Sequence, residues 1–115
     1  MIGNINQKNV QNVPEIIIPN KPEKNKPFDI NVRIKENNNI KKTVKIHKGW
    51  IEIYFKPKND EYPLKIGNFD FAAFGVNNYS ELICKFKTSQ PGKVIVHSYC
   101  NAFGLQKNFI DIDFN

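Results

Sequence analysis

Two cysteines and two histidines are the residues of this 115-residue chain with the widest chemical repertoire. Cys84, Cys100, His47 and His97 are of the types that bind metal ions or form nucleophile–base pairs. Two histidines are too few for a four-imidazole site in one chain, and the sequence has neither a cysteine pair at metal-binding spacing nor a Gly-rich phosphate loop. His97 and Cys100 lie three residues apart, which on a strand places their side chains on opposite faces. A Cys–His catalytic dyad is therefore not expected, and His97 is interpreted as a packed or edge histidine.

The elements that carry these residues are predicted to be strands, because apolar and polar side chains alternate. Phe28, Ile30 and Val32 alternate with Asp29 and Asn31, and the same period of two recurs along the chain. No stretch of useful length shows the 3.6-residue period of an amphipathic helix. Turn-forming residues separate the alternating runs, which predicts an all-β, immunoglobulin-like β-sandwich of about seven strands. The strands are expected near residues 14–18, 27–35, 49–56, 63–73, 79–88, 92–100 and 105–114. The core is expected to contain Phe28, Ile30, Val32, Ile51, Ile53, Phe55, Leu82, Cys84 and Phe86.

Length and composition indicate one domain. The chain is 40% hydrophobic and 12% aromatic, which is sufficient for a single sandwich core over residues 1–115. Residues 1–11 are expected to form a flexible or extended N-terminal segment. The N-terminus resembles no secretory signal and no run of residues is long and apolar enough to span a membrane, so the expected location is cytoplasmic. In that compartment the two cysteines are expected to be free thiols.

The net charge of +6 is concentrated in one stretch. Residues 21–48 contain nine Lys or Arg and three acidic residues, so this stretch carries the whole net charge. Lys41, Lys42, Lys45 and Lys48 are predicted to form an exposed patch that attracts anions. Sixteen of the seventeen basic residues are Lys and few aromatics interrupt the basic stretch, which argues against specific nucleic-acid binding.

Several segments resemble one known family, in order, from about residue 10 to 106. They include residues 12–16 (NVPEI), 50–57 (WIEIYFKP), 66–71 (IGNFDF), 73–75 (AFG) and 98–105 (SYCNAFGL). These segments are similar to the superoxide reductases of the neelaredoxin type and to the iron domain of desulfoferrodoxin. The resemblance implies the superoxide-reductase-like sandwich and an iron site. In the family four imidazoles and one axial cysteine thiolate hold ferrous iron, and the remaining position is open to superoxide.

The resemblance also implies where each ligand would fall in this chain. The family's Glu-Lys-His-Val-Pro motif corresponds to Val10-Gln11-Asn12-Val13-Pro14, so the histidine position carries Asn12. The two middle histidine positions carry Ile40 and Ile46, and the Cys-Asn-x-His-Gly motif retains Cys100 but carries Phe103 at its histidine. Cys100 is thus the only retained ligand position of five. His47 lies one residue beyond an expected position and is a weak candidate ligand.

These substitutions predict a degenerate iron site, and no catalytic residues are expected. The favoured interpretation is a metal-free, non-catalytic superoxide-reductase-like domain that binds a protein partner or has a structural role. One alternative is a divergent superoxide reductase or other metal-binding oxidoreductase that uses Cys100 and His47, with iron as its cofactor. A second alternative is a metal-free redox-sensing thiol at Cys100. Self-association as a homo-oligomer is an expectation from the resemblance alone.

Overall fold

Alternating burial along the chain defines the strands of a two-layer β-sandwich. The computed structural model describes residues 13–35, 49–71, 79–100 and 104–114. The strands are β1 (Glu15–Ile17), β2 (Phe28–Lys35), β3 (Gly49–Pro57), β4 (Leu64–Phe71), β5 (Tyr79–Phe86), β6 (Gly92–Cys100) and β7 (Gly104–Ile112). These bounds lie within two residues of the predicted strands, so the all-β prediction is confirmed. Within the described ranges, no helix of the length and apolarity needed to cross a membrane is found.

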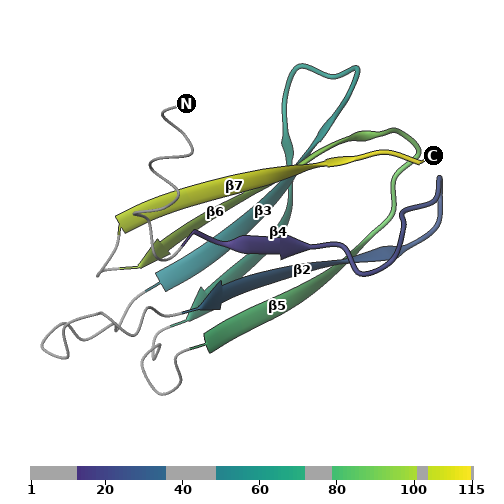
Figure 1. The fold of residues 1–115 in the computed structure, drawn as a ribbon. Coiled ribbons are helices and arrows are strands. Elements are labelled where there is room, and N and C mark those ends of the chain that lie inside the picture. Colours follow the sequence, from purple (N-terminus) through teal and green to yellow (C-terminus); the bar gives the residue numbers. More distant parts are fainter. Residues whose placement is uncertain (1–12, 36–48, 72–78, 101–103, 115) are drawn as a thin grey trace, which may run out of the picture.

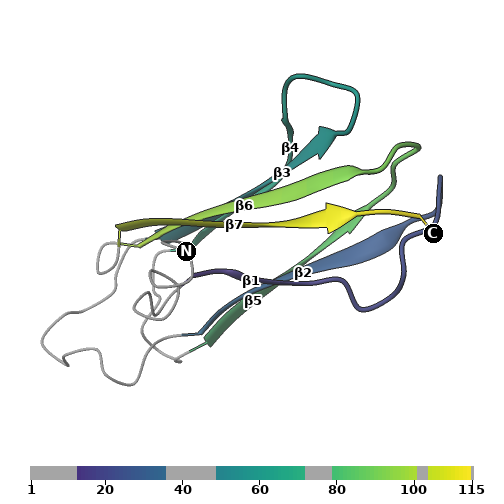
Figure 2. The ribbon, with the colours of Figure 1, turned by 45° about the horizontal axis from the view of Figure 1, so that its top comes forward.

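The strands form two antiparallel sheets that pack face to face. One sheet has the order β1-β2-β5 and the other the order β4-β3-β6-β7 (Figure 1). Figure 2 shows the two layers nearly edge-on, with β6 and β7 above β1, β2 and β5. On one side of the sandwich, the side-chain amide of Asn108 in β7 donates a hydrogen bond to the carbonyl of Pro14 at 2.9 Å. This bond ties the chain that enters β1 to the edge of the other sheet.

The core fills the space between the layers with side chains from the inner faces of four strands. Strand β3 shows the alternation without interruption, since every second residue from Gly49 to Pro57 is buried. The buried hydrophobic residues are Phe28, Ile30, Val32, Ile51, Ile53, Phe55, Val94, Val96, Cys100 and Ile112. The prediction for the inner positions of β2 and β3 is therefore confirmed.

The predicted core residues of β5 do face the core, but they are not fully buried. Leu82, Cys84 and Phe86 are only half-buried, although they pack against the core. Because β5 is paired with β2 alone, it is an edge strand. No strand of its own sheet shields the side of β5 that faces away from β2. Phe86 nevertheless contacts rings in both layers, at 6.1 Å between centroids from Phe28 and 5.0 Å from Phe55.

Candidate functional site

Cys100 is the last residue of β6 and lies on its inner face. In the sheet it is aligned with Gly49 of β3 on one side and Gly104 of β7 on the other. Gly104 has a φ of +75°, a left-handed conformation that favours glycine at the start of β7. The Cys100 side chain is 6% exposed and belongs to the core cluster. Cys100 is thus a small buried residue of the core.

The segments that precede and follow the predicted ligand positions meet at one end of the sandwich. Strand β2 ends at Lys35 and β6 ends at Cys100, while β3 begins at Gly49 and β7 begins at Gly104. The antiparallel registers align Gly49, Cys100 and Gly104, and Figures 1 and 2 show β2 ending at this same end of the sandwich. The start of β1 lies there as well, since Glu15 pairs with Arg33 near the end of β2.

Most of the predicted site residues lie outside the described residues. This applies to Asn12, Ile40, Ile46 and Phe103, to His47, and to the predicted lysine patch, which consists of Lys41, Lys42, Lys45 and Lys48. The resemblance implies that Asn12, Ile40, Ile46 and Phe103 cluster around Cys100. That clustering and the exposed lysine patch therefore stay predictions. Within the residues that the structure describes, no group of three or more His, Cys, Asp or Glu side chains could hold a metal ion.

His97 points to the opposite face of β6 from Cys100, as the spacing predicts. Along β6 the residues alternate between buried and half-buried, with Cys100 in the buried set and His97 in the other. The His97 ring packs against Tyr54 on the outer face of the four-stranded sheet, at 5.3 Å between ring centroids. The nearby rings of Trp50 and Tyr99 stack at 5.8 Å and an interplanar angle of 23°. The predicted placement of His97 and Cys100 on opposite faces of β6 is confirmed.

A polar network that the sequence did not predict lies on this same outer face. The Tyr54 hydroxyl donates to one oxygen of Glu52 at 2.9 Å, and the Lys65 ammonium donates to the other at 3.1 Å. These bonds, that from Lys65 foremost, lower the pKa of Glu52, and the bond to Glu52 raises the pKa of both Tyr54 and Lys65. The i, i+2 spacing of Glu52 and Tyr54 could have indicated their contact. The contact with Lys65 depends on the irregular β3–β4 register at Ile53/Tyr54, which no local pattern shows.

Both cysteines are free thiols, as predicted. The Cys84 sulfur lies 4.0 Å from the carbonyl oxygen of Ile66, between the edge strands of the two sheets. Burial raises the pKa of the Cys84 thiol, which disfavours the reactive thiolate. Among the described residues, Cys84 is half-buried and Cys100 is buried, so neither thiol is openly exposed to solvent.

Comparison with known proteins identifies the family of this sandwich. The family model described as Desulfoferrodoxin matches residues 4–109. The chain belongs to the desulfoferrodoxin family. It is 34% identical over 73 residues to a superoxide reductase of Pyrococcus horikoshii. The aligned region covers 58% of this chain and 59% of that relative. The chain thus spans about three fifths of the length of that relative. A "putative superoxide reductase" of Thermotoga maritima is 30% identical over 108 residues, which cover 85% of the chain and 82% of the relative.

Solved structures of desulfoferrodoxin-family proteins share the fold. The crystal structure of a "putative superoxide reductase" from Thermotoga maritima matches this chain with a TM-score of 0.73 and 26% identity. The structural match covers 94% of this chain and 89% of the chain from Thermotoga maritima. The reduced form of a neelaredoxin variant from Archaeoglobus fulgidus has a TM-score of 0.74 at 24% identity and covers 95% and 94% of the two chains. The predicted superoxide-reductase-like sandwich is confirmed.

The residues at the ligand positions that the resemblance implies do not have the chemistry of an iron site with four imidazoles and one thiolate. Ile40, Ile46 and Phe103 have hydrocarbon side chains without a lone pair for a metal, and the amide of Asn12 is a weak oxygen donor in place of an imidazole. Cys100 alone supplies a ligand of the expected kind, and its side chain packs within the core. One thiolate does not make a stable coordination set for ferrous iron.

Proposed function

We propose that this chain is a non-catalytic member of the desulfoferrodoxin family that has lost iron binding and acts as a binding or structural module. One observation carries the proposal: of the five ligand positions implied by the family resemblance, only Cys100 still carries a metal ligand. Three of the four histidine positions carry hydrocarbon side chains, which cannot bind a cation and are costly to place beside one. The sandwich itself is retained, so the loss concerns the site and leaves the scaffold.

Iron content after expression with added iron tests the loss of the site. The matched control is a variant that restores the four imidazoles, with Asn12→His, Ile40→His, Ile46→His and Phe103→His. We expect the natural chain to purify with far less than one iron per chain by elemental analysis, and to show no thiolate-to-iron absorption band after oxidation. The restored variant should gain iron, and a Cys100→Ala change in that variant should abolish the band.

Stoichiometric iron in the natural chain would refute the proposal and favour the divergent reductase with Cys100 and His47 as ligands. A superoxide-consumption assay on the same preparations would then show whether the bound iron is active. Oxidation of Cys100 by dilute peroxide in the folded, metal-free chain, read by mass spectrometry, would favour the thiol sensor instead. Both outcomes contradict the non-catalytic module.

The partner part of the proposal concerns the outer face of the four-stranded sheet. Leu105 and Phe109 of β7 are more than half exposed there, and Ile95 of β6 is aligned with Phe109. Exposed apolar side chains that share a face are typical of surfaces that bind other proteins. We expect affinity capture from native extract to retain a protein on the natural chain, and Leu105→Ser with Phe109→Ser to abolish this retention. Equal retention by both chains would refute a role for this face.

A further inference from the structure

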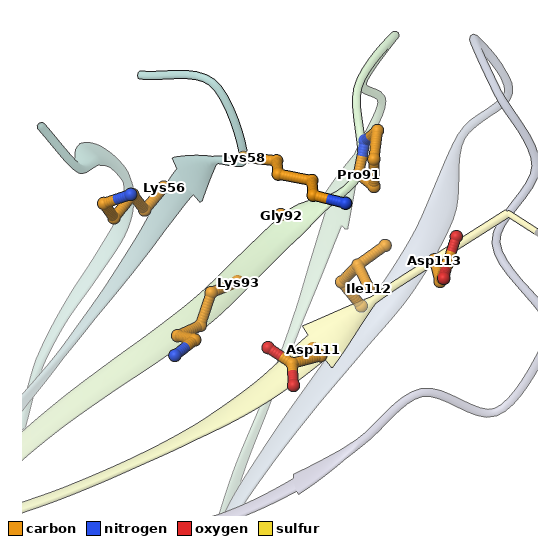
Figure 3. Close-up of a pocket in the computed structure, with 8 residues that line it drawn as sticks. All are labelled: Lys56, Lys58, Pro91, Gly92, Lys93, Asp111, Ile112 and Asp113. Atoms are coloured by element: carbon orange, nitrogen blue, oxygen red, sulfur yellow. The ribbon is translucent and has the colours of Figure 1, made fainter. Parts of the chain in front are cut away.

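A pocket of about 430 Å³ opens at the end of the sandwich that is opposite Cys100. Its walls come from the end of β3 and the following turn, the start of β6 and the end of β7, and Figure 3 shows its lining residues. Gly92 begins β6 and Cys100 ends it, so a nine-residue strand of about 27 Å separates this pocket from the family's iron site. The volume suits a small ligand.

Three lysines line the pocket, and none of their ammonium groups forms an ion pair with a described carboxylate. Lys56 and Lys93 are directly opposite each other in the β3–β6 register, and Lys58 follows in the next turn. Like charges that face each other across strands are destabilising. Within the described part of the chain none of the three lysines has an ion pair, whereas Lys65 on the same sheet is bonded to Glu52 at 3.1 Å. In Figure 3, Lys56 and Lys93 extend to one side of Gly92 and Lys58 extends to the other.

Two carboxylates also line the pocket, but they leave these lysines unpaired. Asp111 is directly opposite Lys93 in the β6–β7 register, and Asp113 follows on the same side of the chain. The Lys93 ammonium lies instead over the ring of Phe109, 4.3 Å from its centroid. The pocket is therefore lined by three lysines, whose ammonium groups are positively charged hydrogen-bond donors, and by two carboxylates, which accept hydrogen bonds.

The backbone of the pocket is held firmly. A Cβ atom on Gly92 would lie 2.3 Å from the carbonyl oxygen of Lys56 and 2.7 Å from the ring of Phe55, so β6 approaches β3 as closely as only glycine allows. The amide of Lys58 donates to the carbonyl of Pro91 at 2.9 Å, which fixes the turn after β3 to the start of β6. The spacing of the three lysine backbones is thus set before any ligand arrives.

We propose that this pocket binds inorganic phosphate as hydrogenphosphate. A dianion neutralises the facing pair of Lys56 and Lys93, which a singly charged carboxylate would do only in part. Hydrogenphosphate keeps one O–H group, and this group can donate to the carboxylate of Asp111, which would repel a fully deprotonated anion. Sulfate has the same shape and charge but no such proton, so the pocket prefers phosphate to sulfate. This site is independent of the proposed loss of iron.

The test is a titration of the ¹⁵N-labelled chain with sodium phosphate, followed by two-dimensional NMR at constant ionic strength, with sodium sulfate in a parallel series. We expect saturable shifts of the Lys58 and Gly92 amide signals that are half-complete at a lower concentration of phosphate than of sulfate. Lys93→Gln should weaken phosphate binding at least about tenfold. Asp111→Asn should remove the preference for phosphate. The exposed Lys24→Gln, outside the pocket, is the matched control and should bind as the natural chain does.

Shifts that grow linearly without saturation, or an equal response to phosphate and sulfate in the natural chain, would overturn the proposal. An equal loss of affinity in Lys24→Gln would also overturn it, because the effect would then reflect net charge alone. Signal dispersion in each spectrum reports whether the variant is folded, and Lys56→Gln repeats the test if Lys93→Gln is not. Iron content does not enter these measurements, so this proposal and the proposed function can fail separately.

Discussion

Replacing Phe55 by alanine tests the packing between the two layers. Phe55 is 1% exposed, and its ring contacts Phe86 of the opposite sheet at 5.0 Å between centroids and an interplanar angle of 52°. Truncation of a buried phenylalanine costs about 3–5 kcal/mol, and the loss of the ring pair is part of that cost. A domain of this size has a total stability of about 5–15 kcal/mol, so the variant should lose about a fifth of it or more.

The matched control is Phe109→Ala, the same chemical change on the outer face of the same sheet. Phe109 is 57% exposed, and its described contact is with the Lys93 ammonium. The loss of that contact and of strand propensity should cost about 1 kcal/mol. Urea denaturation followed by circular dichroism measures both free energies of unfolding. If the two variants are destabilised to within about 0.5 kcal/mol of each other, the assignment of the inner and outer faces of β3 and β7 is wrong.

Three further changes test other parts of the structure. Gly92→Ala should cost at least about 2 kcal/mol in urea denaturation, since its Cβ would lie 2.3 Å from a backbone oxygen of β3, and an unchanged midpoint would contradict that close approach. Glu52→Gln should lower the Tm at neutral pH, because the neighbouring lysine and tyrosine hold the pKa of the carboxyl below its ordinary value of 4.5. The stability from a lowered pKa is present above 4.5 and is lost as the pH falls through the folded-state pKa, so a Tm difference that does not shrink in acid would contradict the network. Cys100→Ser should be less stable than Cys100→Ala by about 1–2 kcal/mol because it buries a hydroxyl, and equal stability in urea would show that the site is open to water.

The strands could be predicted because their signal is local. A strand with one buried face repeats every two residues, and Phe28, Ile30 and Val32 follow that repeat without interruption. The pattern is weaker in β6, where Ile95 is apolar on the outer face, and the buried Val94 and Val96 were not predicted as core. The edge position of β5 depends on which strands pair, and no local pattern contains that information.

The candidate site, too, could be predicted from the sequence only in part. The ligand positions followed from a resemblance in linear sequence, and the ends of the strands that flank them do meet at one end of the sandwich. The polar network and the lysine pocket depend on which residues face each other across strands. Glu52 and Lys65 meet through an irregular register, and Lys56 meets Lys93 only once β3 pairs with β6. A sequence read without its strand pairing cannot place either group.

The proposed loss of iron ligands is compatible with an intact sandwich. In the sequence, Ile40 and Ile46 lie between β2 and β3, and Phe103 lies between β6 and β7, so none of the three is a residue of a described strand. Cys100 differs, because it is the last inner-facing residue of β6 and is 6% exposed within the core cluster. A buried cysteine packs as a small hydrophobe whether or not a metal is present. Its retention is therefore accounted for by packing, and it does not by itself argue for an iron site in this chain.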